Sequence, residues 1–197
     1  MTVNKVMGHY KLAGRLTELT GPWLDRFGRH LDDGHVRIVS ELARHTDRWL
    51  PLLDDHRTLW HGDFRLDNML FQSHGGRQQL AVLDWQSLKS GPGVIDVSYF
   101  LGTSVEPSDR AEHERALVTE YHERVASYEA AEGYSRDDCW LEYRAHAVYG
   151  LVLAIAVSMG VQQTPRGDVM FGTMAARAAA QVADLQTYSA LATLTRS

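Results

Sequence analysis

Residues 59–71, LWHGDFRLDNMLF, place charged and amide side chains inside a short run that is otherwise apolar. Apolar residues flank the polar ones on both sides, which is typical of a segment that folds into the interior. A carboxylate withdrawn from water is costly unless a cation or hydrogen-bond donors accompany it. The stretch therefore predicts a loop whose acidic groups are neutralised by a bound cation.

The spacing of the polar residues indicates a particular chemistry. His61, Asp63 and Asn68 follow the pattern H-x-D-x-x-x-x-N, and Asp84 ends the apolar segment LAVLD further along the chain. Amide and carboxylate oxygens are hard ligands that suit Mg²⁺, which takes its other ligands from water and phosphates. Asp63 is then free to accept a proton from a substrate hydroxyl, and Arg65 can neutralise a phosphoryl group in transit. These parts together predict phosphoryl transfer.

The segments HGDFRLDN and VLDWQ, together with SGPGVIDVSYFL, resemble the catalytic region of aminoglycoside phosphotransferase and choline-kinase-like enzymes, in particular their ecdysteroid-kinase-like branch. These enzymes are relatives of the protein kinases, whose signature combines H-R-D-L-x-x-x-N with D-F-G. The resemblance covers about residues 59–101. Trp85 and Gln86 stand where protein kinases have Phe-Gly, so no DFG-type switch is expected.

The resemblance implies a role for each polar residue of the region, and it implies ATP and Mg²⁺ as cofactors. The roles are catalytic groups at Asp63 and Arg65, metal and nucleotide ligands at Asn68 and Asp84, and supports for the loop at His61 and Asp96. Asp96 is expected to open a helix and to hold the catalytic loop by hydrogen bonds. The acceptor implied is a hydroxyl on a small molecule, whose identity the sequence does not give.

Periodicity predicts a mostly α-helical α+β fold with a small β insert. Helices are expected over 9–31, 35–53, 94–103, 107–131, 135–162 and 167–190. Between them, TLWHGD, NMLFQ and QLAVLDW read as strands, and the turn SHGGRQ predicts a hairpin joining the last two. We expect a single lobe over 1–197. It consists of a helical lead-in (1–56), the catalytic and metal-binding insert (57–92) and a helical body (93–197).

The predicted fold corresponds to the C-terminal lobe of a protein-kinase-like enzyme without its N-terminal β-lobe. No G-x-G-x-x-G motif occurs, and none of the three lysines, Lys5, Lys11 and Lys89, lies in a V-A-I-K-like strand. Loss of one charged hydrogen bond from lysine to phosphate costs about 1.5–3 kcal/mol. We therefore expect a truncated lobe with weak Mg-ATP binding and little or no activity alone, and the enzymatic status of this chain stays open.

Composition excludes several other classes. The net charge is −5 without a basic cluster, which argues against a nucleic-acid partner. A lone cysteine, Cys139, suits a reducing, cytoplasmic location and is expected to be a buried helix residue. The N-terminus lacks the apolar core of a signal peptide, and the longest apolar run, 149–161, is shorter than the about 20 residues that span a bilayer. No zinc-ligand spacing is evident.

Two alternatives to the kinase lobe remain open. One is a non-catalytic kinase-like binding or scaffolding module, whose exposed apolar face would be covered by a second copy in a homodimer. If the chain is instead a kinase lobe, a separate N-lobe would cover that face. The other is a phosphohydrolase that uses the same trio with water as acceptor. Elsewhere, the acidic and histidine residues of 113–123 are expected on a solvated helix face, and Met159, Met170 and Met174 between packed helices.

Overall fold

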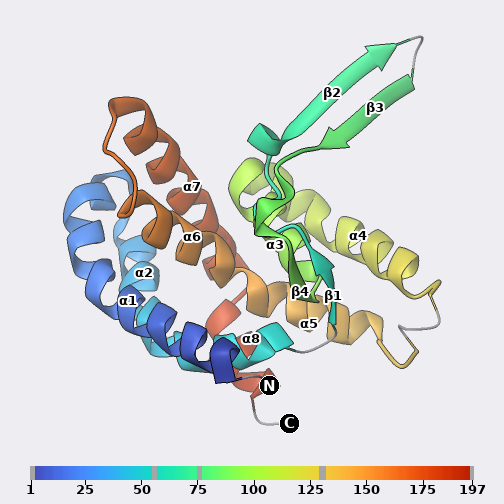
Figure 1. Ribbon diagram of the computed structural model, residues 1–197, viewed down its shortest axis with the longest axis horizontal. Helices are drawn as coiled ribbons and strands as arrows, with labels where there is room; N and C mark the ends of the chain where they lie inside the picture. The colour runs from blue at the N-terminus through green and yellow to red at the C-terminus, as the bar shows by residue number, and fades with distance from the viewer. Residues whose placement is uncertain (1–2, 55–56, 75–76, 129–131, 196–197) are drawn as a thin grey trace.

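The computed structural model describes residues 3–54, 57–74, 77–128 and 132–195. A body of helices carries two small antiparallel sheets, and one of these sheets projects away from the body (Figure 1). The helices are α1 (Val3–Phe27), α2 (Asp33–Trp49), α3 (Val94–Ser104), α4 (Pro107–Val125), α5 (Arg136–His146), α6 (Val148–Ser158), α7 (Pro165–Asp184) and α8 (Thr187–Leu194). The predicted fold class, mostly helical with small sheets, is confirmed.

Helix starts follow the capping residues in the sequence. Asp32 accepts a hydrogen bond from the His35 amide at 2.8 Å and caps α2. Pro107 occupies the first turn of α4, and Ser135 forms a reciprocal capping box with Asp138 at the start of α5. The Asp32 and Ser135 side chains accept from amide groups that have no partner within the helix, whereas Pro107 has no such amide to satisfy. Both features favour a helix start at these residues.

Two predicted helices are divided in the structure. The helix expected over 135–162 is broken at Ala147 into α5 and α6, and the one expected over 167–190 is broken at Leu185 and Gln186 into α7 and α8. Gln186 adopts the left-handed conformation, with φ of 49°. At the N-terminal end, α1 begins at Val3 rather than near residue 9. The helix expected over 107–131 ends earlier, because α4 stops at Val125 and Ala126 is its C-cap.

The strands form two separate pairs. β2 (Met69–His74) and β3 (Arg77–Val82) pair as the predicted hairpin, with Met69 opposite Val82. The residues at the tip of its turn, 75 and 76, lie outside the described residues. β1 (Arg57–Trp60) pairs with β4 (Lys89–Pro92), a strand that the sequence did not predict. The first pair projects into solvent, whereas the second lies against the helical body (Figure 1).

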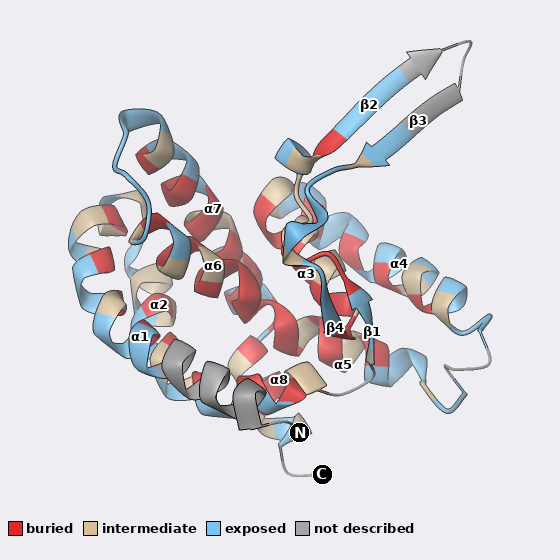
Figure 2. Cartoon of the chain, viewed as in Figure 1, coloured by how far each residue is buried: buried red, intermediate tan, exposed pale blue. Residues whose placement is uncertain are grey.

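The core lies among the helices. Fully buried side chains such as Trp23, Trp49, Tyr143 and Leu151 join α1, α2, α5 and α6 (Figure 2). The apolar run predicted to be central forms α6, most of which is buried, and Cys139 is buried in α5. Within the described part of the chain, no helix combines the length and apolarity that crossing a bilayer requires.

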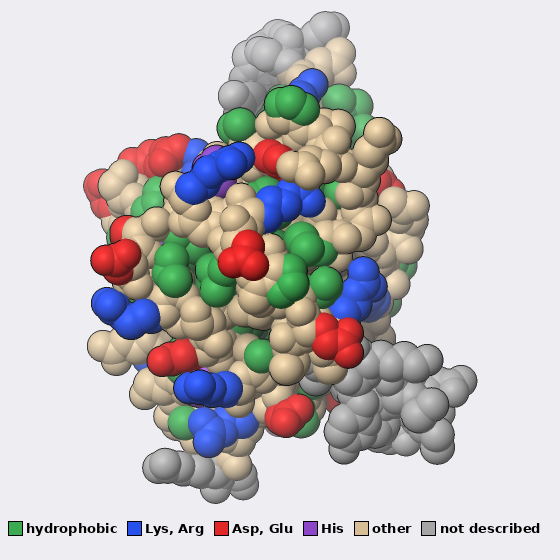
Figure 3. Space-filling view, turned by 90° about the vertical axis from the view of Figure 1, so that its left-hand side faces the viewer, with side chains coloured by type: hydrophobic (Ala, Val, Ile, Leu, Met, Phe, Trp, Pro, Cys, Tyr) green, Lys and Arg blue, Asp and Glu red, His purple; other side chains and the backbone are tan. Residues whose placement is uncertain are grey.

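The surface differs from the sequence expectation in two places. Glu114 and His122, expected on a solvated face, are buried where α4 packs on the body. Met174 is buried as expected, whereas Met170 is partly exposed and borders a hollow that is also lined by Arg65, Leu66 and Asp67. On the face drawn in Figure 3, acidic and basic side chains are interspersed among hydrophobic ones, so neither sign of charge dominates that face.

Candidate active site

The loop that follows β1 is held in place by one carboxylate from the first turn of α3. Asp96 accepts hydrogen bonds from the amides of His61 at 2.5 Å and Gly62 at 3.0 Å. On the other side of the loop, the Tyr149 hydroxyl donates to the Gly62 carbonyl at 2.6 Å. Gly62 has φ of +83°, and a Cβ at this position would lie 2.6 Å from the Ser87 carbonyl oxygen. Only glycine fits here without strain.

His61 links the loop to the strand end that precedes Asp84. Its Nδ1 accepts from the Asp63 amide at 3.2 Å, so the neutral ring carries its proton on Nε2, which donates to the Leu83 carbonyl at 2.8 Å. The Leu83 amide in turn donates to the Asn68 carbonyl at 2.8 Å. The backbone of Leu83 therefore ties together the segments that carry Asp63, Asn68 and Asp84.

Asp63 and Asn68 are in direct contact. The Asn68 amide donates to the Asp63 carbonyl oxygen at 2.8 Å and to its carboxylate Oδ2 at 2.9 Å. Asn68 lies in a short 3-10 turn, η3 (Leu66–Asn68), which returns the chain toward Asp63 before β2 begins. The other carboxylate oxygen, Oδ1, accepts from the Tyr99 hydroxyl at 3.1 Å. The Asp63 side chain remains 30% exposed and so is accessible to a ligand.

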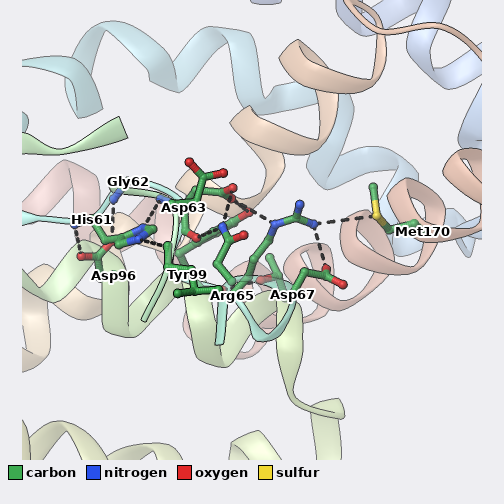
Figure 4. Close-up of polar contacts among 12 residues, drawn as sticks. His61, Gly62, Asp63, Arg65, Asp67, Asp96, Tyr99 and Met170 are labelled. Atoms are coloured by element: carbon green, nitrogen blue, oxygen red, sulfur yellow. Dashed lines mark hydrogen bonds and ion pairs between the residues drawn. The ribbon is translucent and has the colours of Figure 1, made fainter. Parts of the chain in front are cut away.

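Arg65 lies beside this carboxylate and extends away from it. Its Nε is 3.2 Å from Asp63 Oδ1, and another guanidinium nitrogen is 3.0 Å from Asp67 Oδ2. The same nitrogen lies 3.8 Å from the Met170 sulfur on α7 (Figure 4). The guanidinium group thus stands between the Asp63 carboxylate and the hollow bordered by α7.

Asp84 adopts an unusual backbone conformation at the end of β3. Its φ of 63° and ψ of 58° place it in the left-handed region, which Asp tolerates better than most residues but still at a cost. Its exposed carboxylate accepts a hydrogen bond from the Gln86 amide at 3.3 Å. A strained backbone is a frequent feature of residues that position a functional group.

Burial changes the acid–base properties of the groups around the loop. Burial raises the pKa of Asp96, against the opposing effect of the two backbone amides that it accepts. Burial also raises the pKa of Tyr99, as does the adjacent negative charge of Asp63. Tyr99 is therefore a protonated donor to Asp63 at neutral pH, and it cannot serve as a base.

Sequence reasoning missed the two tyrosines that contact the loop. Tyr99 follows Asp96 by one helical turn, so both residues face the loop, and this spacing was the available signal. Tyr149 lies 87 residues from its partner Gly62, and its hydroxyl in an otherwise apolar helix is a weaker signal. Tyr99 and Tyr149 also pack edge-on, with ring centroids 5.3 Å apart.

Residues 12–134 match the ecdysteroid kinase-like family. This chain belongs to that family. The match includes the loop of residues 61–68, the hairpin and α3, and the family is one of kinase-like phosphotransferases. The resemblance noted in the sequence is therefore confirmed at the level of the family.

Curated relatives of this ecdysteroid kinase-like chain are much longer proteins. Acyl-CoA dehydrogenase family member 11 of Gallus gallus is 43% identical over 64 residues, which are 32% of this chain and 8% of the relative. Family member 10 of Mus musculus is 46% identical over 55 residues, or 26% and 5% of the two chains. The human member 11 is 31% identical over 90 residues, or 45% and 11%. No solved structure matches the chain.

Proposed function

We propose that this ecdysteroid kinase-like chain is the C-terminal lobe of an ATP- and Mg²⁺-dependent phosphotransferase that acts on a small-molecule hydroxyl. The observation that carries the proposal is the contact of the Asn68 amide with the Asp63 carboxylate, in a loop clamped by Asp96. A base held beside a metal-ligating amide is the arrangement that phosphoryl transfer needs. We also propose that the lobe consists of a helical lead-in (residues 1–56), the insert that carries the loop (57–92) and a helical body (93–197).

Asp63 is the proposed base. Oδ1 accepts from Tyr99 and also lies 3.2 Å from Arg65 Nε, whereas Oδ2, which accepts from Asn68, keeps capacity for a further donor. An acceptor hydroxyl that approaches the exposed part of this carboxylate donates its proton as the new phosphoester bond forms. Arg65 supplies the positive charge beside the reacting group, and His61 keeps the loop in register with β3.

Asn68 and Asp84 are the proposed ligands of Mg²⁺, and their chemistry fits this ion. The Asn68 nitrogen is bonded to Asp63, which leaves its side-chain oxygen available, and the Asp84 carboxylate is exposed. No group of three His, Cys, Asp or Glu side chains in the described residues could hold a metal. Bound Mg²⁺ would neutralise phosphate charge and take its remaining ligands from phosphates and water.

The nucleotide is proposed to bind over the β2–β3 hairpin. Phe71 and Leu80, which are paired across the two strands, are exposed on one face of the hairpin, and Leu70 is exposed on the other face. Such exposed apolar surface is typical of a binding site. Residues 3–54, before the loop, are helical rather than β-rich. We propose that a β-rich N-terminal lobe, supplied in trans or by a longer chain, completes the ATP site, and that the chain alone has little activity.

A self-associating, non-catalytic module is the second candidate function. The same exposed side chains favour it, because a second copy could cover them as well as a nucleotide-binding lobe could. The oligomeric state of the purified chain, measured by sedimentation, and its phosphate transfer with an N-lobe supplied together distinguish this module from a kinase lobe. A stable dimer that never transfers phosphate, even with an N-lobe supplied, would favour the module over the kinase lobe.

Two measurements test the catalytic proposal. Calorimetry should show weak Mg-ATP binding to the isolated chain, and micromolar affinity would contradict the need for an N-lobe. With that lobe supplied, Asp63→Asn should lower kcat by about 10²–10⁴-fold with little change in ATP affinity, because only the base is lost. Asp137→Asn, on an exposed carboxylate remote from the loop, is the matched control. Unchanged turnover in Asp63→Asn would remove the base assignment.

A further inference from the structure

A hollow of about 320 Å³ lies directly beyond Arg65, between the catalytic loop, the end of α3 and one side of α7. Its volume is at the small end of the range for ligand pockets. Arg65 lies between the hollow and the Asp63 carboxylate, because one edge of its guanidinium contacts Asp63 and another contacts Met170 (Figure 4). A molecule in the hollow would therefore need only to pass Arg65 for a hydroxyl to reach Asp63.

The hollow has an apolar part and a cationic part. Leu66, Met170 and Met174 supply apolar surface to its lining. Its charged lining groups are two arginines, Arg65 and Arg177, and one aspartate, Asp67, so the cations outnumber the anion. The hydroxyl-bearing residues Ser104 and Thr173 add hydrogen-bonding capacity beside Arg177. This combination suits a short apolar stem that ends in a negative charge.

The two arginines differ in how firmly they are paired. Arg65 is held between Asp63 and Asp67, at the end of the hollow that is next to the proposed reacting group. Arg177 contacts Glu106 and donates to the Thr103 carbonyl oxygen at 3.5 Å. Glu106 does not line this hollow, and its side chain is 60% exposed, against 24% for Arg177. An ion pair with one well-solvated partner is weak, so another carboxylate can replace Glu106 at small cost.

We propose that this hollow is the acceptor site of the kinase and that the acceptor is a small alcohol carrying a carboxylate. The proposal rests on the proposed function and adds the class of substrate. Arg177 binds the carboxylate in place of Glu106, and the stem lies against Leu66 and Met170. The hydroxyl lies at Asp63, which takes its proton. A planar guanidinium is well suited to a carboxylate because it can donate two parallel hydrogen bonds.

The first test is a binding measurement without nucleotide. Ligand-observed NMR on the 197-residue chain compares 6-hydroxyhexanoate, 1,6-hexanediol and 6-amino-1-hexanol, which differ at one end only. The hydroxy acid should bind at least about tenfold more tightly than the other two, as expected for loss of a charged hydrogen bond. Equal affinity for the diol or the amino alcohol, or no binding of the acid, would overturn the proposal.

Two substitutions at the proposed carboxylate-binding end of the hollow should change the affinity for the hydroxy acid in opposite directions. Arg177→Gln should weaken binding of the acid at least about tenfold and leave the diol unaffected. Glu106→Gln removes the competing carboxylate and should tighten acid binding, a gain that misfolding cannot produce. Glu106 makes no side-chain bond to the start of α4, so the helix loses no cap. Arg124→Gln, at an exposed arginine paired only across one helix turn, is the control.

The proposed substrate class and the proposed kinase function can be tested separately. Asp63→Asn should retain acid binding, since Asp63 contacts only the hydroxyl. Acid binding that depends on Arg177, without phosphate transfer when an N-lobe is supplied, would keep the anion site and reject the kinase function. Phosphate transfer to diol and acid alike would keep the kinase and reject the substrate class. Acid binding unchanged in Arg177→Gln would also reject the site.

Discussion

The helical body and the β2–β3 hairpin distribute apolar side chains in opposite ways. In α6 of the body, Leu151 and Ile155 are completely buried. In the hairpin, Leu70, Phe71 and Leu80 are all more than half exposed (Figure 2). The hydrophobic effect stabilises the first region internally, whereas the second gains little from burial. A two-stranded hairpin with such a surface is marginal by itself and is typical of a binding face.

Polar side chains show a related difference. In the body, the Arg110 guanidinium is 1% exposed and is paired with Glu114 at 2.8 Å and with Asp184. Tyr143 completes this network by donating to Glu114 at 2.7 Å. In the loop of residues 61–68, Asp63 is also bonded on both oxygens but stays partly open to solvent. The body network therefore stabilises the fold, while the loop network holds the proposed base at the surface.

The largest effect is expected from breaking the body network. Arg110→Met leaves the buried Glu114 carboxylate with Tyr143 alone, and an uncompensated buried charge of this kind costs about 3–5 kcal/mol of unfolding free energy. Urea denaturation measures the change. Arg124→Met, at an exposed ion pair, should change stability by less than about 1 kcal/mol. The double variant Arg110→Met with Glu114→Gln should recover part of the loss; no recovery would show that the charge is not the cause.

A buried histidine in the body should produce an intermediate effect that depends on pH. His146 accepts from the Trp49 indole at 3.0 Å, and burial lowers its pKa to about 3. Because the folded pKa lies below the unfolded value of about 6.5, its contribution to stability is complete above pH 6.5 and is lost as pH falls toward 3. Between pH 7 and 4.5 the loss is about 2–3 kcal/mol.

The matched variant for this prediction is His146→Gln, which keeps an acceptor for Trp49 and cannot be protonated. Urea unfolding of both proteins at pH 7 and 4.5 gives four free energies, and their double difference isolates the histidine. His61 has both ring nitrogens bonded, whereas Nε2 of His146 has no hydrogen-bond partner among the described residues. A double difference near zero would mean that water or a carboxylate reaches His146 as pH falls.

Local signals in the sequence predicted more of this molecule than long-range ones did. The helix starts expected at 107 and 135 and the Gly-Gly turn of the hairpin are local signals, and the elements that they mark are present. The breaks at Ala147 and Gln186 carry neither glycine nor proline, so periodicity alone could not reveal them. β4 was missed because its partner β1 lies about 30 residues earlier and the strand contains Gly-Pro.

The same distinction applies to the candidate site. The spacing of His61, Asp63 and Asn68 placed them on one loop, and the structure brings Asn68 against Asp63. Asp84 is attached to the same loop through the Leu83 backbone, which no sequence pattern announces. Tyr149 and the α7 side of the hollow come from helices far along the chain. Their contribution depends on helix packing and could not be read from local spacing.

The smallest effect is expected in the hairpin, where it tests the comparison directly. Leu70→Ala removes a side chain that is 57% exposed, so the unfolding free energy should change by less than about 0.5 kcal/mol. Leu151→Ala makes the same chemical change at a fully buried position of α6 and should cost about 2–5 kcal/mol, because it leaves a cavity. Urea denaturation of the two variants under one set of conditions gives both values.

A substantial loss in Leu70→Ala would mean that this side chain already packs against something in solution, such as a second copy of the chain. Repeating the measurement at several protein concentrations identifies that case, since stability that comes from association rises with concentration. A loss that does not depend on concentration would instead show that the hairpin contributes to the core. The proposal that the exposed apolar side chains of the hairpin bind a nucleotide and a second lobe would then lose its main support.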